Sequence, residues 1–201
     1  MIPVHTRSPE AHVEAPTAGS VILAGVLSKL GGYGFPRFSI PMFPEASIFS
    51  TPLIYVMSVV AVIYISLTTL RQVDLKKIIA YPSVAHMAFV TLGIFTYNLQ
   101  AIEGSILLMS SHGVVSSALF MCVGVLYDRH KTRIIKYYSG MIQVMPISMT
   151  LSLIFTLANL SLPTTGGFIG EFLVIIGLFQ SNKIITFLAA TGMVFGAAYS
   201  I

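Results

Sequence analysis

Long apolar segments alternate with short polar ones along the whole chain. Five of them predict membrane-spanning helices, at residues 17–35, 51–70, 78–98, 104–126 and 141–181, and a further apolar stretch covers residues 184–201. A helix needs about 20 residues to cross the apolar core of a bilayer, which these segments supply. The pattern therefore predicts an all-α fold: a single membrane domain, built as a polytopic, antiporter-like helix bundle.

The fifth segment is interrupted in its middle. The sequence PTTGG at residues 163–167 separates two apolar runs, and the second run begins at Phe168. Unwound backbone at membrane depth is stable only where protein or enclosed water satisfies its polar groups. We therefore expect one discontinuous span over residues 141–181, although a simple proline kink is compatible with the same pattern. The last stretch, 184–201, stops without a polar flank, so we expect it to be truncated.

Composition excludes a water-soluble globular protein. Only 9% of the residues are charged and 55% are hydrophobic, whereas soluble domains are about 25% charged. The single cysteine, Cys122, excludes an internal disulfide and a cysteine-based metal site. The remaining histidines, His5, His12 and His130, have no ligand-like spacing, so no metal is expected.

Basic residues are distributed unequally between the two sides of the predicted bundle. Eight lysines and arginines lie on the side of the N-terminal residues, and two, Arg37 and Lys183, lie on the other side. Basic loops stay on the cytoplasmic or matrix side of a membrane. We therefore predict that residues 1–16 form a loop on the inner side and residues 36–50 an interfacial loop on the outer side. The basic segment 127–136 is then a topology signal rather than a nucleic-acid site.

Four ionisable residues lie inside the predicted spans: Lys29, His86, His112 and Glu171. Placing a lysine at the bilayer centre costs about 2.5–3.5 kcal/mol on insertion scales, so such residues commonly serve a function. At a rise of about 1.5 Å per residue, the lysine and both histidines lie near mid-depth. Each of these side chains can exchange a proton near neutral pH once burial and neighbouring groups adjust it. The row therefore predicts a lateral proton path.

Glycines accompany two of these residues. Gly25 and Gly32 flank Lys29 at helical spacing and predict close approach of a neighbouring helix. The glycines within residues 166–170 precede Glu171 and are expected to leave backbone groups free to hydrate.

His86 and His112 could serve either proton transfer or a hydrogen bond between helices. Ser105 and Ser116 share the helical face of His112 and predict a polar stripe that could hold water. An isolated histidine in a membrane helix, however, more often bonds a neighbouring helix than carries a proton. Both roles stay open for His86 and His112 on sequence grounds.

Five segments carry highly specific motifs: PEAHVEAPTAGSVILAGVLSKLGGYG, LKKIIAYPSVAHM, SHGVVSSALF, VGVLYDRHKTR and LSLPTTGGFIGEF. Together they resemble the subunit 4 family of mitochondrial NADH–ubiquinone oxidoreductase, respiratory complex I, in its land-plant form. The resemblance implies an antiporter-like subunit in which Lys29 is the central proton relay, His86 and His112 continue the path, and Glu171 is the terminal proton site. An earlier glutamate and lysine of the family have no counterpart in this chain.

The chain departs from the family pattern at five positions. Arg7 and Ser8 stand where the family has tryptophan and leucine, and Ser28, Pro36 and Pro82 stand in place of leucine, leucine and serine. Each difference is what one cytidine left unconverted to uridine would produce in a codon, and plant mitochondrial transcripts are edited in that way. We therefore expect the sequence to be a conceptual translation of an unedited, partial gene.

These observations predict a proton-translocating membrane-arm subunit of an NADH:ubiquinone reductase in the mitochondrial inner membrane, with its N-terminal residues on the matrix side. Its partners are other membrane-arm subunits and the lipid bilayer, with no nucleic acid. No redox chemistry is expected in this chain, because its glycines lie in membrane helices rather than in nucleotide-binding turns. The resemblance places NADH, flavin, iron–sulfur clusters and ubiquinone in other subunits. The alternatives are a stand-alone cation/proton antiporter subunit and a non-functional fragment.

Overall fold

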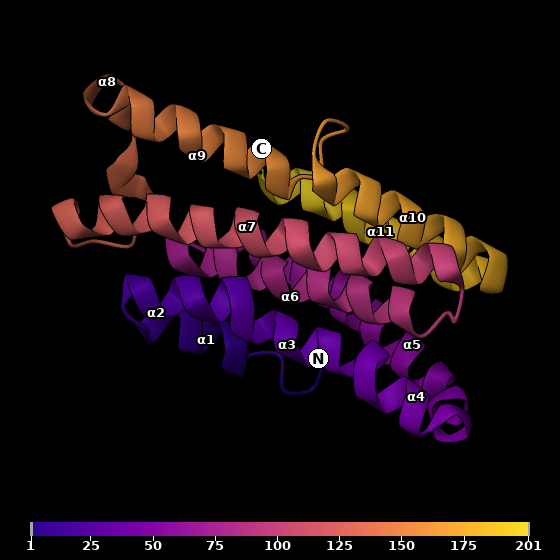
Figure 1. Ribbon diagram of the computed structural model, residues 1–201. Coiled ribbons are helices and arrows are strands. Elements are labelled where there is room, and N and C mark those ends of the chain that lie inside the picture. Colours follow the sequence, from indigo (N-terminus) through magenta and orange to yellow (C-terminus); the bar gives the residue numbers. More distant parts are fainter. Residues whose placement is uncertain (1, 201) are drawn as a thin grey trace.

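The computed structural model, which describes residues 2–200, is a bundle of long helices (Figure 1). This confirms the predicted all-α fold, since a single bridge between Asp74 and Ile134 is the only β pairing among the described residues. The helical elements are α1 (Arg7–Glu14), α2 (Thr17–Ile22), the π-helical turn η1 (Leu23–Leu27), α3 (Ser28–Gly34), the π-helical turn η2 (Phe35–Ser39), α4 (Ile40–Met42), α5 (Pro44–Thr69), α6 (Leu75–Ile94), α7 (Leu99–His130), the 3-10 turn η3 (Ile135–Tyr138), α8 (Met141–Val144), α9 (Pro146–Asn159), α10 (Gly166–Ser181) and α11 (Lys183–Ser200).

Five helical runs are long and apolar enough to cross a membrane: Thr17–Met42, α5, α6, α7 and α11. Two shorter apolar helices, α9 and α10, follow one another along α7 in Figure 1 and are joined by residues 160–165. The break lies slightly earlier than the predicted 163–167, because the glycines at 166 and 167 open α10. Ser161 has a φ of 58° inside the break. The pair α9–α10 has the form of a discontinuous span.

The first span is longer than the sequence predicts. The helical run continues to Met42, and within residues 36–50 the only non-helical residue is Phe43. The predicted interfacial loop is therefore wrong. Pro44 opens α5 directly after Phe43, where proline costs little because its missing N–H has no helical partner to lose. Pro36 and Pro41 lie inside the continuous run, each at the second position of η2 or α4.

The N-terminal residues also differ from prediction, because they contain the helix α1 rather than a simple loop. Pro9, His12 and Val13 are buried at the i, i+3, i+4 spacing of one helical face. This face packs against α6 and α2. In Figure 1, α1 lies alongside α2. The high polarity of the segment hid this narrow buried face in the sequence.

Helices α7 and α10 share the most extensive interface of the bundle. Gly104 and Gly170 make it possible. A Cβ built on Gly170 would lie 3.0 Å from the carbonyl oxygen of Gly104, and one on Gly104 would lie 2.9 Å from the carbonyl oxygen of Gly170. Small residues that let two backbones touch are the usual basis of helix packing in membranes. The contact fixes α10, and therefore Glu171, against α7.

Candidate functional site

Lys29 connects the first span to α7. Its Nζ lies 3.0 Å from Nδ1 of His112 and donates to the carbonyl of Ala24 at 2.5 Å. The π-helical turn η1 frees that carbonyl from its backbone partner, because the N–H of Ser28 donates to Leu23 instead of to Ala24, and the carbonyl then accepts from the lysine and from the Ser28 hydroxyl at 3.0 Å. A single extra residue in one helical turn thus provides the lysine with a backbone acceptor.

Close helix packing brings Lys29 within reach of His112. A Cβ on Gly113 would lie 3.0 Å from the carbonyl oxygen of Gly25 and 3.7 Å from Cε of Lys29. On the first span, a Cβ built on Gly32 would lie 2.6 Å from the sulfur of Met109 on α7. The close approach predicted from Gly25 and Gly32 is confirmed, and α7 is the helix that approaches.

The two histidines face each other across α6 and α7. The ring centroids of His86 and His112 are 5.0 Å apart, with 48° between the ring planes. In the described part of the chain, Nε2 of each ring is buried and has no hydrogen-bond partner. Both rings line a cavity of about 10 Å³ accessible to the centre of a water molecule, which is close to the volume that one water requires.

Glu171 lies at the other end of this row. Its Oε1 is 2.9 Å from Nδ1 of His86, and the two side chains are 4% and 13% exposed. The structure therefore brings all four predicted residues together, in the order Lys29, His112, His86, Glu171, from the helices α3, α7, α6 and α10. Within residues 2–200, no group of three histidine, cysteine or acidic side chains is arranged to hold a metal ion.

Two sequence-based expectations about the surroundings are wrong. The buried hydroxyls of Ser105 and Ser116 donate to carbonyls three residues earlier on α7, so they form no free polar stripe. Ser111 lines the cavity between the histidines instead. Gly170 is buried against Leu108 of α7 rather than exposing backbone to water, whereas Gly166 borders Ser111 and stays exposed. Gly170, directly before Glu171, serves helix contact, which its spacing alone did not distinguish from hydration.

Asn159 and Tyr199 were not predicted from the sequence, yet they line the space beyond Glu171. A cavity of about 30 Å³ contains His86, Glu171, Asn159 and Tyr199 on its walls. A second cavity of about 380 Å³ shares Asn159 and Tyr199 and extends to Tyr138 on η3. The position of Asn159 at the last residue of α9, directly before the break, is the one sequence signal that could have indicated it.

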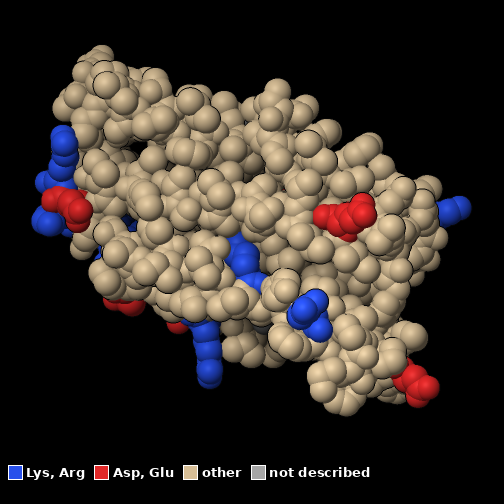
Figure 2. Space-filling view, viewed as in Figure 1, with Lys and Arg blue, Asp and Glu red and all other residues tan. Residues whose placement is uncertain are grey.

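Lys29 is also reachable from the bundle surface. It lines an open groove of about 530 Å³ between the first span and α7, whose other walls are mainly apolar. Figure 2 shows Lys or Arg atoms in a hollow near the middle of this face, surrounded by uncharged surface. The first span is otherwise exposed along most of its length, with Val26, Leu27 and Leu30 each more than half exposed.

Comparison with known proteins identifies the family. The model of the family described as NADH:quinone oxidoreductase/Mrp antiporter, transmembrane, matches residues 1–196. The chain belongs to this family. It is similar to NADH-ubiquinone oxidoreductase chain 4 of Marchantia polymorpha, with 70% identity over 201 residues, which cover 100% of this chain and 41% of that protein. The chain thus spans less than half the length of this relative, and the resemblance inferred from its motifs is confirmed.

Solved structures share the fold. A chain in the structure of respiratory complex I from Thermus thermophilus with bound NADH superposes with a TM-score of 0.93 at 32% identity, covering 99% of this chain and 43% of that one. A chain of the Mrp complex from Dietzia sp. superposes with a TM-score of 0.92 at 18% identity, covering 99% and 37%. At that identity the second match shows the fold alone.

Proposed function

We propose that this chain is part of a proton-translocating membrane-arm subunit of an NADH:ubiquinone oxidoreductase. The observation that carries the proposal is the unbroken row of Lys29, His112, His86 and Glu171 through the middle of the bundle. Ionisable residues at this depth are costly unless they serve a function, and here each one contacts the next. Family membership and the similarity to subunits of respiratory complexes support the assignment.

The geometry supports a defined sequence of proton transfers. Protonated Lys29 gives a proton to Nδ1 of His112, which releases its Nε2 proton to a water in the shared cavity. That water passes a proton to Nε2 of His86, whose Nδ1 proton then moves to Glu171. Each imidazole accepts at one nitrogen and releases from the other. The net result converts a lysine cation and a glutamate anion into two neutral groups.

Electron transfer in other subunits would drive this row by changing the charge around it. A charge change near a buried ion pair alters its energy strongly, because the interior screens charges less than water does. The chain itself then needs no redox cofactor, and NADH, flavin, iron–sulfur clusters and ubiquinone belong to partner subunits. The proposed partners are other subunits of the membrane arm.

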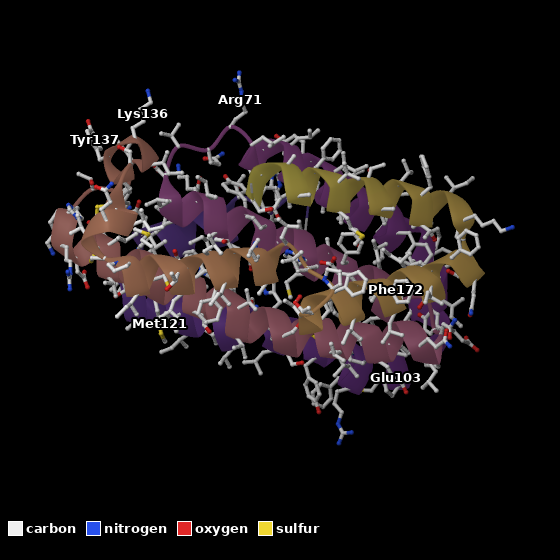
Figure 3. All side chains as sticks on the ribbon, turned by 90° about the horizontal axis from the view of Figure 1, so that it is seen from above. Arg71, Glu103, Met121, Lys136, Tyr137 and Phe172 are labelled. Atoms are coloured by element: carbon white, nitrogen blue, oxygen red, sulfur yellow. The ribbon has the colours of Figure 1, made fainter. Side chains whose placement is uncertain are left out.

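The proposed location is the mitochondrial inner membrane, with the basic end of the bundle in the matrix. Arg71 and Lys136 lie toward the same end in Figure 3, away from Glu103. Concentration of basic residues at one end supports this orientation, because basic loops stay on the inner side.

Replacing Lys29 tests the proposed function. In membranes that contain the assembled oxidoreductase, Lys29→Gln should abolish NADH-driven proton translocation, whereas Lys77→Gln on the surface should leave it unchanged. Translocation is followed with a pH-sensitive dye and oxidation by the absorbance of NADH. Normal pumping and normal oxidation in Lys29→Gln membranes would remove Lys29 from the mechanism.

A stand-alone cation/proton antiporter subunit is the second candidate, and the family description, which names the Mrp antiporter beside the oxidoreductase, favours it. Such a protein would exchange sodium for protons without any electron input. Sodium-dependent proton movement in vesicles that lack NADH would support this candidate over the first.

A further inference from the structure

His12 is a buried titratable residue that the proposed row does not use. It is 1% exposed and its ring stacks on Phe120 of α7, with centroids 5.2 Å apart and 13° between the planes. Its Nδ1 is buried and has no hydrogen-bond partner in the described part of the chain. The hydroxyl of Ser20 donates to the backbone carbonyl of His12 at 2.7 Å and holds this turn against α2. The ring is thus fixed, enclosed and chemically free at one nitrogen.

The position of His12 relates it to Lys29. Phe120, on which His12 stacks, belongs to the same buried cluster as Ala24. The carbonyl of Ala24 is the acceptor for Lys29 Nζ. His12 and the backbone acceptor of Lys29 thus border the same buried cluster.

The residues that follow His12 contact basic side chains at the end of the bundle that contains Lys76 and Arg133, called the basic end below. Three residues later, the carbonyl of Ala15 accepts a hydrogen bond of 3.0 Å from Nζ of Lys76, a side chain that is only 2% exposed. Beyond it, Arg133 lies over the ring of Tyr127 at 5.2 Å. Helix α1 thus carries both His12 and, just beyond its end, the backbone acceptor of Lys76.

The charges around His12 favour its neutral form. Burial, and after it the positive charge of Lys29, lower the pKa of His12 from its ordinary value. Lys29 on α3 is the charged group that acts on His12. Glu10 and Glu14, on the same helix as His12, are exposed, and Lys76 on α6 bonds the carbonyl three residues after His12 and contacts the ring of Tyr127. A neutral imidazole near a lysine takes up a proton more readily once the charge on that lysine is lost.

We propose that His12 supplies protons to Lys29 from the basic end of the bundle, as a further proton-carrying residue of the row; this rests on the proposed function. After Lys29 has given its proton to His112, the amine is neutral and no longer repels a charge at His12. His12 then accepts a proton at Nδ1 from water that enters at the basic end. It releases a ring proton through water to the Lys29 amine, which restores the ammonium and the neutral imidazole.

His12→Phe in the assembled oxidoreductase tests this proposal. Phenylalanine keeps an aromatic ring for stacking on Phe120 but cannot bind a proton. The matched control is His5→Phe, because His5 also has a buried Nδ1 without a partner but contacts Tyr64 of α5, at a ring distance of 5.3 Å. Native gels check assembly, and proton translocation per NADH is measured while the pH on the basic-end side is varied.

The expected result is normal assembly in both variants and a loss of translocation in His12→Phe that deepens as the pH on the basic-end side rises. A positioned proton-transfer group typically contributes about 10²–10⁴-fold to a rate, so the loss should be large. The same translocation and pH profile as in His5→Phe would overturn the proposal and leave His12 with a packing role. Lys29→Gln, measured in parallel, separates the two hypotheses. If Lys29→Gln translocates protons normally, the proposed function fails. If Lys29→Gln stops translocation but His12→Phe does not, only the proposed role of His12 fails.

Discussion

Gly113→Ala should uncouple Lys29 from His112 by a small displacement. A Cβ at position 113 would lie 3.0 Å from the carbonyl oxygen of Gly25, and ordinary contact begins at 3.4 Å. Relieving the overlap therefore requires the first span and α7 to separate by about 0.4 Å, against the close approach that small residues permit. The contact between Lys29 and His112 would then lengthen from 3.0 Å to about 3.4 Å, beyond the range of a normal hydrogen bond.

The side chain of Lys29 cannot easily follow this movement. The carbonyl of Ala24 holds the same ammonium at 2.5 Å, and Ala24 moves with the first span. If a misplacement of 1 Å costs about 10²-fold in rate, a displacement of about 0.4 Å costs roughly sixfold. We therefore expect NADH-driven proton translocation to fall about sixfold in Gly113→Ala.

The matched control is Gly31→Ala, on the same span as Lys29. It makes the same chemical change, and a Cβ at position 31 would meet nothing within 4 Å. The assay compares proton translocation and NADH oxidation in membranes with equal amounts of assembled complex. If Gly113→Ala and Gly31→Ala pumped equally well, the Lys29–His112 contact would not be the step that controls translocation.

Two further predictions concern stability. Ser28 lines a cavity of about 160 Å³, and because a void larger than a methyl group costs about 1 kcal/mol, Ser28→Leu should raise the free energy of unfolding by about that amount in thermal denaturation. An unchanged or lower free energy of unfolding would contradict this prediction. Separately, a transcript that keeps the genomic codon at position 28 would contradict the editing hypothesis there. Lys76→Met should lower stability by about 1–3 kcal/mol, because it leaves the carbonyl of Ala15 with only the longer contact of 3.4 Å from the Ser20 hydroxyl. Lys77→Met should cost less than about 1 kcal/mol, since Lys77 makes a half-exposed ion pair of 3.8 Å with Asp74, and equal losses in both variants would refute the argument.

Signals within short stretches of sequence, such as the length of apolar segments and the PTTGG interruption, predicted the membrane-spanning helices and the break between α9 and α10. The segment around Phe43 shows their limit, because prolines that usually mark loops here lie inside a helical run or open the next helix. Lys76 shows it again, since this lysine lies outside the predicted span 78–98 and yet is buried in the first turn of α6. Both errors arise because a polar or proline-rich stretch can pack against distant helices, which no local window contains.

The sequence by itself determined that this is a membrane helix bundle with four ionisable residues at depth. Apolar length and the high cost of buried charge are local properties, so they can be read without coordinates. Only the tertiary structure decided their order, because Lys29 and His112 are 83 positions apart and meet through the contact of Gly25 with Gly113. The backbone acceptor at Ala24 and the enclosed ring of His12 likewise depend on a π-helical turn and on packing between separate helices.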